Sequence, residues 1–286
     1  MQFIADLHIH SKYARWCSNR LDVENIWKTC IIKWIDIIWT WDFTHPQRLG
    51  ELQDFLESDG NGFFIPKQNF LKKRFEEIKP YLNESVIEKM DKWFYPRFVL
   101  QTEINNVFQR WEKKYRVHNV FLIDNLDDAQ KILDYLWQFG KVESDWRLAV
   151  RQDQTETLLW LKTNFPQIIF FAGHIWTPHF WVLGSRLNFK WMKDAYLQSC
   201  NLMDAIETWL SSDPIMNWIN SDLDNFAILS NSDAHSPENF AREANIFEFK
   251  NVRKFVWYKD LEKAIKSRKF ENGDINDIEK EYLNTL

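Results

Sequence analysis

The feature of this chain that most limits its possible folds is a repeated order of apolar runs, polar clusters and helical stretches. Each run is rich in Ile, Val or Phe and ends near His, Asp, Glu, Asn or Ser. Amphipathic stretches lie between most of the runs, for example LDVENIWKTCII at 21–32. This alternation is typical of a parallel sheet with crossover helices. We expect an α/β barrel, because closing the sheet would bring the polar clusters to one rim, where such barrels have their active sites.

Seven apolar runs define the organisation of the chain. They are QFIADLHIH, IDIIWTWDFTH, RFVLQTEIN, RVHNVFLID, QIIFFAGHIWTP, MDAIETWLSSD and FAILSNSDAH. With 286 residues, of which 45% are hydrophobic, the chain can build one large core. We expect one domain over residues 1–265, with an irregular insertion at about 50–91 that contains the turn sequence ESDGNG followed by charged helical stretches. The charged tail at 266–286 is predicted to be a helix or a connector to something absent.

Charge, cysteine count and hydropathy narrow the functional classes. The net charge of −5 gives no overall footprint for nucleic acid, so such a partner would need a local basic patch or bound cations. Cys17, Cys30 and Cys200 are odd in number and form no CxxC pair, so neither a disulfide framework nor a cysteine zinc site is supported. The chain has no long apolar run and opens directly on a strand, which predicts a soluble, cytoplasmic protein.

Histidine is concentrated in the polar clusters. Six of the seven histidines fall there: His8, His10, His45, His118, His174 and His235. His8 and His10 alternate along a strand, so both point to one face, which they share with Asp6. Asp233 and His235 repeat this alternation after the last run. Taken alone, the first pair could lie on an exposed edge, and the second could be a helix cap or a turn.

Carboxylates at the ends of other runs extend the histidine set. Asp42, Glu103 and Glu207 each lie at the end of a predicted strand. Imidazoles and carboxylates together suit Zn²⁺, Mn²⁺ or Fe²⁺ rather than Ca²⁺. At one rim, so many titratable groups would need cations to offset their repulsion and desolvation. We therefore predict two or three divalent metal ions, which suit phosphoester hydrolysis because they activate water and bind phosphate oxygens.

Other side chains near the predicted rim are candidates for catalysis or substrate binding. The catalytic candidates are Asp233, His45 and Glu207, and for His45 a metal ligand, a proton donor and a turn residue remain equally open. Several Lys and Arg side chains near the ends of the motifs could bind phosphates, or they could simply be solvated charges on the surface. They are Lys12, Arg116, Arg147 and Arg186. Trp176 and Trp218 could stack on a base, with packing as the alternative.

Taken together, the motifs resemble those of a known superfamily. DLHIHSKYAR, WDFTHP, QTEIN, VHN, AGHIWTPHF, ETWLSSDPIMNW and SNSDAHSP are similar, in this order, to the polymerase and histidinol phosphatase (PHP) superfamily, within it the branch of endonuclease Q. The resemblance spans the first residues to about Phe249. It implies a distorted (β/α)7 barrel, a centre of two or three metal ions, and cleavage of DNA beside uracil, hypoxanthine or an abasic site. The implied metal ligands are His8, His10, Asp42, Glu103, His118, His174, Asp233 and His235.

One departure from the branch concerns the end of the chain. Members of the branch continue into a cysteine-rich, zinc-binding module that helps to hold DNA, whereas this sequence stops at Leu286 without those cysteines. We therefore expect a truncated gene or a shorter relative. A phosphatase for a small phosphomonoester and a catalytically silent barrel that serves as an interaction module remain alternatives.

A second departure concerns tryptophan. The sequence has 16 Trp and 7 Gly, although glycine makes up about 7% of ordinary chains. The branch has glycine at five of the written tryptophans, namely Trp34, Trp39, Trp41, Trp146 and Trp209. The codon UGA is read as tryptophan in one variant genetic code and as glycine in another. We therefore expect glycine in the natural protein at these five positions, and also at Trp16 and Trp111.

Overall fold

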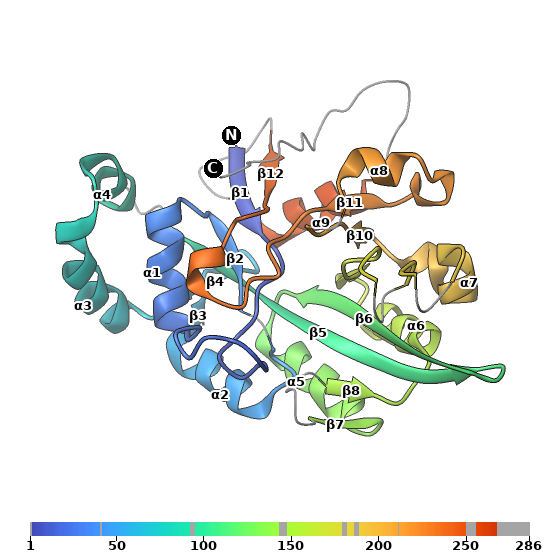
Figure 1. The fold of residues 1–286 in the computed structure, drawn as a ribbon. Coiled ribbons are helices and arrows are strands. Elements are labelled where there is room, and N and C mark those ends of the chain that lie inside the picture. Colours follow the sequence, from blue (N-terminus) through green and yellow to red (C-terminus); the bar gives the residue numbers. More distant parts are fainter. Residues whose placement is uncertain are drawn as a thin grey trace.

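The computed structural model describes residues 2–40, 42–91, 95–142, 148–178, 182–185, 189–210, 212–249 and 256–267. Within these residues a 12-stranded mixed sheet curls into a nearly closed barrel (Figure 1), which confirms the predicted fold class. Along the sheet the order is β11 (Ala227–Leu229), β10 (Ala205–Glu207), β9 (Ile169–Ala172), β6 (Lys113–Ile123), β5 (Arg97–Arg110), β2 (Ile37–Trp39), β1 (Gln2–Asp6) and β12 (Asn245–Glu248). The remaining strands are β3 (Leu56–Ser58), β4 (Phe64–Pro66), β7 (Gly140–Val142) and β8 (Leu148–Val150).

The directions of the strands explain how the polar clusters meet. β1, β2 and β5 are parallel neighbours, as are β9, β10 and β11. The expectation of a parallel sheet is wrong at β6 and β12, which run antiparallel to their neighbours. β5 and β6 are joined by a two-residue turn, which can connect only antiparallel strands. Because β6 pairs antiparallel with β5, His118 lies opposite Asn105 and shares a face of the sheet with Glu103.

The barrel is drawn together where the segments after β1 and β11 meet. Ile9 and Ala234 form a parallel bridge there, and the amide of His10 donates to the carbonyl of Ala234 at 2.9 Å. The HxH and DAH motifs therefore lie side by side, although they stand at opposite ends of the sequence.

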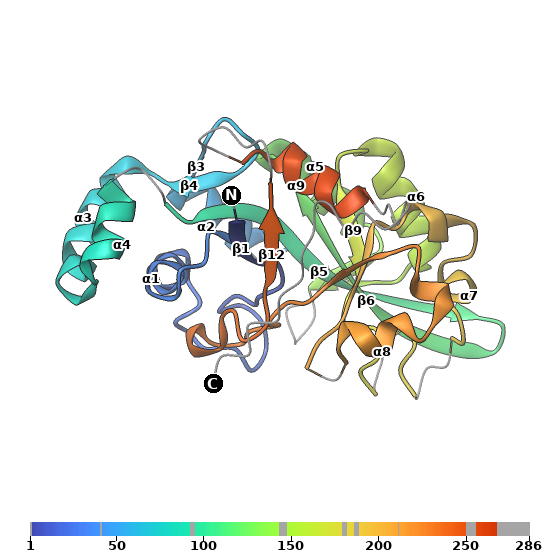
Figure 2. The same ribbon diagram turned by 90° about the horizontal axis from the view of Figure 1, so that it is seen from above.

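Helices surround the sheet. They are α1 (Val23–Lys33), α2 (Pro46–Phe55), α3 (Gln68–Ile78), α4 (Glu84–Asp91), α5 (Leu126–Leu136), α6 (Gln154–Asn164), α7 (Met192–Tyr196), α8 (Pro214–Trp218) and α9 (Tyr258–Lys266). β3, β4, α3 and α4 lie within the stretch that we expected to be an insertion, and Figures 1 and 2 show α3 and α4 at the periphery, beyond α1. The long hairpin of β5 and β6 extends on the other side, near α7. None of the described helices is long and apolar enough to cross a membrane.

Local sequence signals account for the ends of the helices. The Asp22 side chain accepts from the amide of Asn25 at 2.8 Å and caps α1, as the short polar residues favoured at this position do. Pro46 opens α2 directly after its cap, His45, because proline has no amide that the first turn would leave unsatisfied. α1 ends at Trp34, whose φ of 62° is left-handed. That conformation is usually supplied by glycine at the end of a helix.

Candidate metal centre

The first donor group combines residues from near the two ends of the sequence. Nitrogen atoms of His8 and His10 and a carboxylate oxygen of Asp233 all lie within 4.8 Å of one another. Asp233 Oδ1 is 2.5 Å from His10 Nε2 and 3.8 Å from His8 Nε2. All three residues are buried. The bridge between Ile9 and Ala234 creates this group, because each of the two residues lies between ligands of its own motif.

The second donor group comes from the middle of the sheet. Glu103 on β5 has its Oε1 atom 2.7 Å from His118 Nδ1 on β6 and 3.1 Å from Nε2 of His174, which follows β9. These ligand atoms also lie within 4.8 Å of one another, and the residues are buried. The rings of His8 and His174 have centroids 5.7 Å apart, so the two groups adjoin. The structure therefore brings six of the eight predicted metal ligands into two adjacent groups.

A third donor group overlaps the first. It consists of His10, His235 and Cys17, with ligand atoms again within 4.8 Å of one another. The sequence predicted the two histidines as ligands but not the cysteine. Cys17 has no partner in a CxxC motif, so only its position in space distinguishes it from Cys30 and Cys200.

Burial and charge act against each other in this centre. Burial alone would lower the pKa of His8, but the neighbouring carboxylate of Glu207 raises that pKa to about 10. Burial alone would raise the pKa of Asp233, but His10 and His8 hold it well below its usual range. Positive charge is thus strongly favoured among these carboxylates. A divalent cation can supply that charge in place of the protons, and the buried imidazoles and carboxylates fit such an ion.

Glu207 lies behind His8. Its two oxygens are 2.8 and 2.9 Å from His8 Nδ1, and one of them accepts from Asn231 Nδ2 at 2.8 Å. The other accepts from the backbone amide of His174 at 2.9 Å. Since both oxygens are engaged, this arrangement favours an orienting role for Glu207 over the catalytic role expected from the sequence. A carboxylate on one ring nitrogen leaves the other nitrogen to face a metal.

Asp6 and Asn231 also support the centre from behind. Asp6 accepts from the amides of Ser232 at 3.1 Å and of Ala241 at 2.9 Å, and burial raises its pKa to about 6. Asn231 Oδ1 accepts from the amide of Leu7 at 2.9 Å. Asp6 therefore holds the loop before Asp233 instead of joining His8 and His10 as a ligand. Asn231 was not among the predicted site residues, and its only signal in the sequence was its place inside the SNSDAHSP motif.

Asp42 and His45 lie on the loop between β2 and α2. Asp42 accepts from Ser11 Oγ at 2.7 Å and belongs to none of the three donor groups found in the described residues. His45 caps α2 through Nδ1, which accepts from the amide of Arg48 at 3.4 Å, and its ring stacks on Tyr13 with centroids 4.7 Å apart. Burial and Arg48 lower the pKa of His45. With Nδ1 accepting, the neutral ring carries its proton on Nε2 and offers a hydrogen-bond donor there, not a lone pair for a metal ion.

The candidate substrate-binding residues are spread more widely. Lys12 Nζ is 2.8 Å from Glu51 Oε1 at the edge of the rim, and Arg116 is exposed on β6. Trp176 donates from Nε1 to Asn217 Oδ1 at 2.7 Å, which fixes its ring against α8, whereas Trp218 is 57% exposed. Arg147 and Arg186 lie outside the described residues.

The backbone separates the written tryptophans into two kinds. Trp16, Trp34 and Trp111 have φ values of 67°, 62° and 55°, in the left-handed region that favours glycine. Trp39 and Trp209 have no such φ, but each has a buried indole Nε1 without a hydrogen-bond partner among the described residues. Trp41 and Trp146 lie outside the described residues.

Trp39 occupies the interior of the barrel. Val120 pairs with Glu103 on one side and with Phe171 on the other, so all three side chains share one face of the sheet. The ring of Trp39 contacts that of Phe171, with centroids 5.8 Å apart. A large side chain therefore fills space on the face that carries Glu103, a member of the second donor group.

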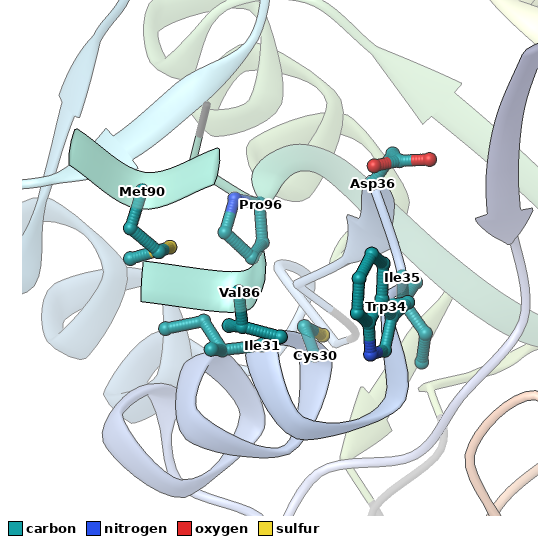
Figure 3. A pocket seen from close by; sticks show the side chains of 8 residues that line it. All are labelled: Cys30, Ile31, Trp34, Ile35, Asp36, Val86, Met90 and Pro96. Carbon is teal, nitrogen blue, oxygen red and sulfur yellow. The ribbon is translucent and has the colours of Figure 1, made fainter. Parts of the chain in front are cut away.

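A small pocket lies away from this centre. Figure 3 shows it between α1, which supplies Cys30 and Ile31, and α4, which supplies Val86 and Met90. Trp34 also lines it. None of its lining residues belongs to a donor group, so the pocket does not contribute to the chemistry of the rim.

Comparisons with known proteins bear on the fold. No family model matches the chain. Over 136 residues it is 29% identical to the uncharacterized protein MJ0043 of Methanocaldococcus jannaschii, a match covering 48% of this chain and 12% of that protein. The structure matches the lesion-specific endonuclease PfuEndoQ from Pyrococcus furiosus with a TM-score of 0.71 at 23% identity, covering 93% of this chain and 56% of that chain.

A second solved structure gives the same result. It is endonuclease Q in complex with a 27-mer duplex substrate that has an abasic lesion at the active site. The TM-score is 0.72 at 24% identity, covering 93% of this chain and 57% of that chain. The chain thus has the fold of endonuclease Q, and this is the fold that the resemblance of the motifs implied. It spans little more than half of those chains and about an eighth of MJ0043.

Proposed function

We propose that this chain is a metal-dependent phosphodiesterase that cleaves a DNA strand beside a deaminated base, such as uracil or hypoxanthine, or beside an abasic site. The observation that carries the proposal is the pair of adjacent, buried donor groups at one rim of an endonuclease Q fold. Both groups combine imidazole with carboxylate, and each could hold one ion of a pair that acts on one phosphate.

The chain's own residues divide the work at this rim. Divalent ions, when bound, activate water and stabilise the charge on the phosphate oxygens. Asp233 and Glu103 each link two histidines and supply the negative charge that holds the ions. Glu207 orients His8 through Nδ1, so that Nε2 faces Asp233. His45, whose Nδ1 accepts from the amide of Arg48, would donate a hydrogen bond from Nε2 to an oxygen of the substrate.

We assign DNA contacts to side chains around the rim. Lys12 is the cation nearest to the HxH motif in sequence and would contact a phosphate, with Glu51 as its partner when DNA is absent. Trp218 is exposed on α8 and would stack on a base, whereas Trp176 positions α8 through Asn217. Arg116, which is exposed on β6 in the β5–β6 hairpin, would contact the DNA backbone farther from the rim. Arg147 and Arg186 remain candidates for the same role.

A phosphatase for a small phosphomonoester is the second candidate. The net charge of −5 suits it better, because a protein with a net negative charge gives no overall attraction for the DNA backbone. The ion pair between Lys12 and Glu51 points the same way, since it neutralises a cation at the rim.

One experiment separates these functions. Purified protein with Mn²⁺ or Zn²⁺ is incubated with labelled duplexes that contain uracil, hypoxanthine, an abasic site or only normal bases, and separately with p-nitrophenyl phosphate. We expect strand cleavage at the lesions and none of the undamaged duplex. Hydrolysis of p-nitrophenyl phosphate without duplex cleavage would establish the phosphatase instead. Metal binding without turnover of any substrate would indicate a silent interaction module.

A matched pair of variants connects the activity to the centre. Asp233→Asn removes a ligand charge and should lower cleavage at least about 100-fold while the barrel stays folded. Asp224→Asn changes an exposed carboxylate outside the donor groups and should leave cleavage unchanged. Elemental analysis of dialysed protein should find at least two divalent ions per chain. Finding none in protein with a cooperative thermal transition would refute the assignment.

A further inference from the structure

We propose that Cys17 is a metal ligand, whose thiolate forms a three-donor group with His10 and His235 that prefers Zn²⁺ to Mn²⁺ or Mg²⁺. The ligand atoms of the three residues lie within 4.8 Å of one another. The rings of His10 and His235 are in contact, with centroids 3.9 Å apart. This proposal concerns the rim of the proposed active site, but it depends on neither DNA nor turnover.

The fold holds Cys17 at this place. The loop that carries it is tied to the DAH segment by a hydrogen bond from the amide of Ser18 to the carbonyl of His235, at 2.9 Å. The same loop is closed on itself, because the amide of Lys12 donates to the carbonyl of Leu21 at 3.2 Å and that of Cys17 to Ala14 at 3.3 Å. These backbone hydrogen bonds hold the loop of Cys17 beside His235, so the short distance between the two residues does not depend on one side-chain conformation alone.

The histidine beside Cys17 is set up to bind a metal. His235 Nδ1 is 2.8 Å from the carbonyl of Asp233, so Nδ1 carries the proton and donates. The lone pair then lies on Nε2, the nitrogen that a metal ion would use. A backbone carbonyl on one ring nitrogen of a histidine is the usual partner of a metal bound to the other.

The chemistry of the donors determines the preferred ion. Thiolate is a soft ligand that selects Zn²⁺ or an iron ion, whereas Mn²⁺ and Mg²⁺ prefer oxygen ligands. Two imidazoles and one thiolate supply three protein ligands, the number found in catalytic zinc sites, which keep a fourth position open. Cys17 is only partly buried, so this group lies on the solvent side of the centre, and the shared His10 links it to Asp233.

The other two cysteines serve as internal controls. Cys30 on α1 and Cys200 in the 3-10 helix Leu197–Leu202 are buried in the core, and neither belongs to a donor group among the described residues. A sulfur signal that depends on Cys17 alone therefore identifies the ligand.

Cobalt substitution tests the proposal without measuring activity. Protein stripped with a chelator and loaded with Co²⁺ should show a thiolate-to-cobalt charge-transfer absorption in the near ultraviolet. Cys17→Ala should abolish this absorption and weaken zinc binding at least about 10-fold, whereas the matched variant Cys200→Ala should change neither. Cobalt binding without the charge-transfer absorption would overturn the role of Cys17 and leave the proposed function standing. Failure to bind cobalt at all would overturn both.

A second measurement needs no variant, so it holds even if Cys17→Ala fails to fold. Native wild-type protein is treated with iodoacetamide with and without Zn²⁺, and the modified peptides are identified by mass spectrometry. Zinc should protect Cys17 from alkylation, and a chelator should restore its reactivity. Equal alkylation of Cys17 in both samples would refute the proposal.

Discussion

The turn between β5 and β6 predicts an unusual order of stability among variants of Trp111. Trp111 and Glu112 form a two-residue hairpin loop between the paired residues Arg110 and Lys113. Only the first of the two loop residues has a positive φ, 55° at Trp111, as in a type II′ turn, which favours glycine at that position. The indole is 76% exposed, so its removal costs little packing. Trp111→Gly and Trp111→Ala therefore differ chiefly in the backbone.

Two opposing terms give the size of the difference. A side chain in left-handed backbone costs about 1–2 kcal/mol, which only glycine avoids. Glycine loses about 0.5–1 kcal/mol more chain entropy than alanine on folding. Trp111→Gly should therefore be more stable than Trp111→Ala by about 0.5–1 kcal/mol. At Trp137, where φ is −65°, only the entropy acts, and the glycine variant should be the less stable by about 0.5–1 kcal/mol.

Urea unfolding followed by far-ultraviolet circular dichroism measures this order without relying on tryptophan fluorescence. The midpoints should shift while the m-values stay equal, because the surface exposed on unfolding hardly changes. A glycine variant at 111 that is no more stable than the alanine variant, with the ordinary order preserved at 137, would show that the left-handed backbone is not strained.

Trp16 and Trp34 have the same left-handed backbone as Trp111, and this bears on which residue the natural protein carries at these positions. Trp16, 83% exposed with a φ of 67°, and Trp34, which ends α1, should show the same order of glycine above alanine. We expect peptides of the protein from its source organism to contain glycine at these positions and at Trp39 and Trp41. Tryptophan in those peptides would refute the misreading of UGA, and the filled space beside Glu103 would then be a real feature of the barrel.

Three further predictions test the support of the metal centre and its surroundings. Glu207→Gln keeps only one acceptor for three donors, so zinc affinity measured by titration should fall about 10–100-fold; unchanged affinity would contradict the orienting role. Lys12→Gln should weaken DNA binding and reduce its salt dependence by about one phosphate contact, whereas Lys28→Gln, paired with Glu24 on α1, should change neither. In the folded state the pKa of Asp6 is raised to about 6 from 3.8, so the folded state binds a proton more tightly than the unfolded state does. As the pH rises from 3.8 to about 6, the free energy of unfolding of wild type should therefore fall by up to about 3 kcal/mol relative to that of Asp6→Asn. A difference between the two proteins that stays constant over this pH range would contradict the raised pKa.

Much of the fold and of the centre was predictable because strand and helix periods are local. Alternation along the strand predicted that His8 and His10 share a face, and both lie in the first donor group. It predicted the same for Asp233 and His235, of which Asp233 lies in the first donor group and His235 in the third. The amphipathic stretch expected at 21–32 forms α1, which runs from Val23 to Lys33. The position of polar residues at the ends of apolar runs was enough to predict that histidines and carboxylates gather at one rim of an α/β barrel.

The direction of β6 was not predictable from its own pattern. An apolar run reads the same whether the strand runs parallel or antiparallel to its neighbours, and only the pairing with β5 and β9 shows that His118 faces Glu103. Asp42 shows that a polar residue at the end of a strand need not join a donor group. It was predicted as a metal ligand, but it accepts a hydrogen bond from Ser11 and lies in none of the donor groups of the described residues.

By itself, the sequence determined most strands of the main sheet, the fold class and the set of chemical groups expected at the rim. Only the tertiary structure gathered six of the predicted ligands into two donor groups, placed Glu207 behind His8, and brought Cys17 close to His10 and His235. The physical reason is distance along the chain: Leu7 and Asn231 are hydrogen-bonded although 224 residues apart, as part of the contact that brings HxH and DAH together. Local periodicity carries no information about such a contact, which forms only when burial of the whole core closes the barrel.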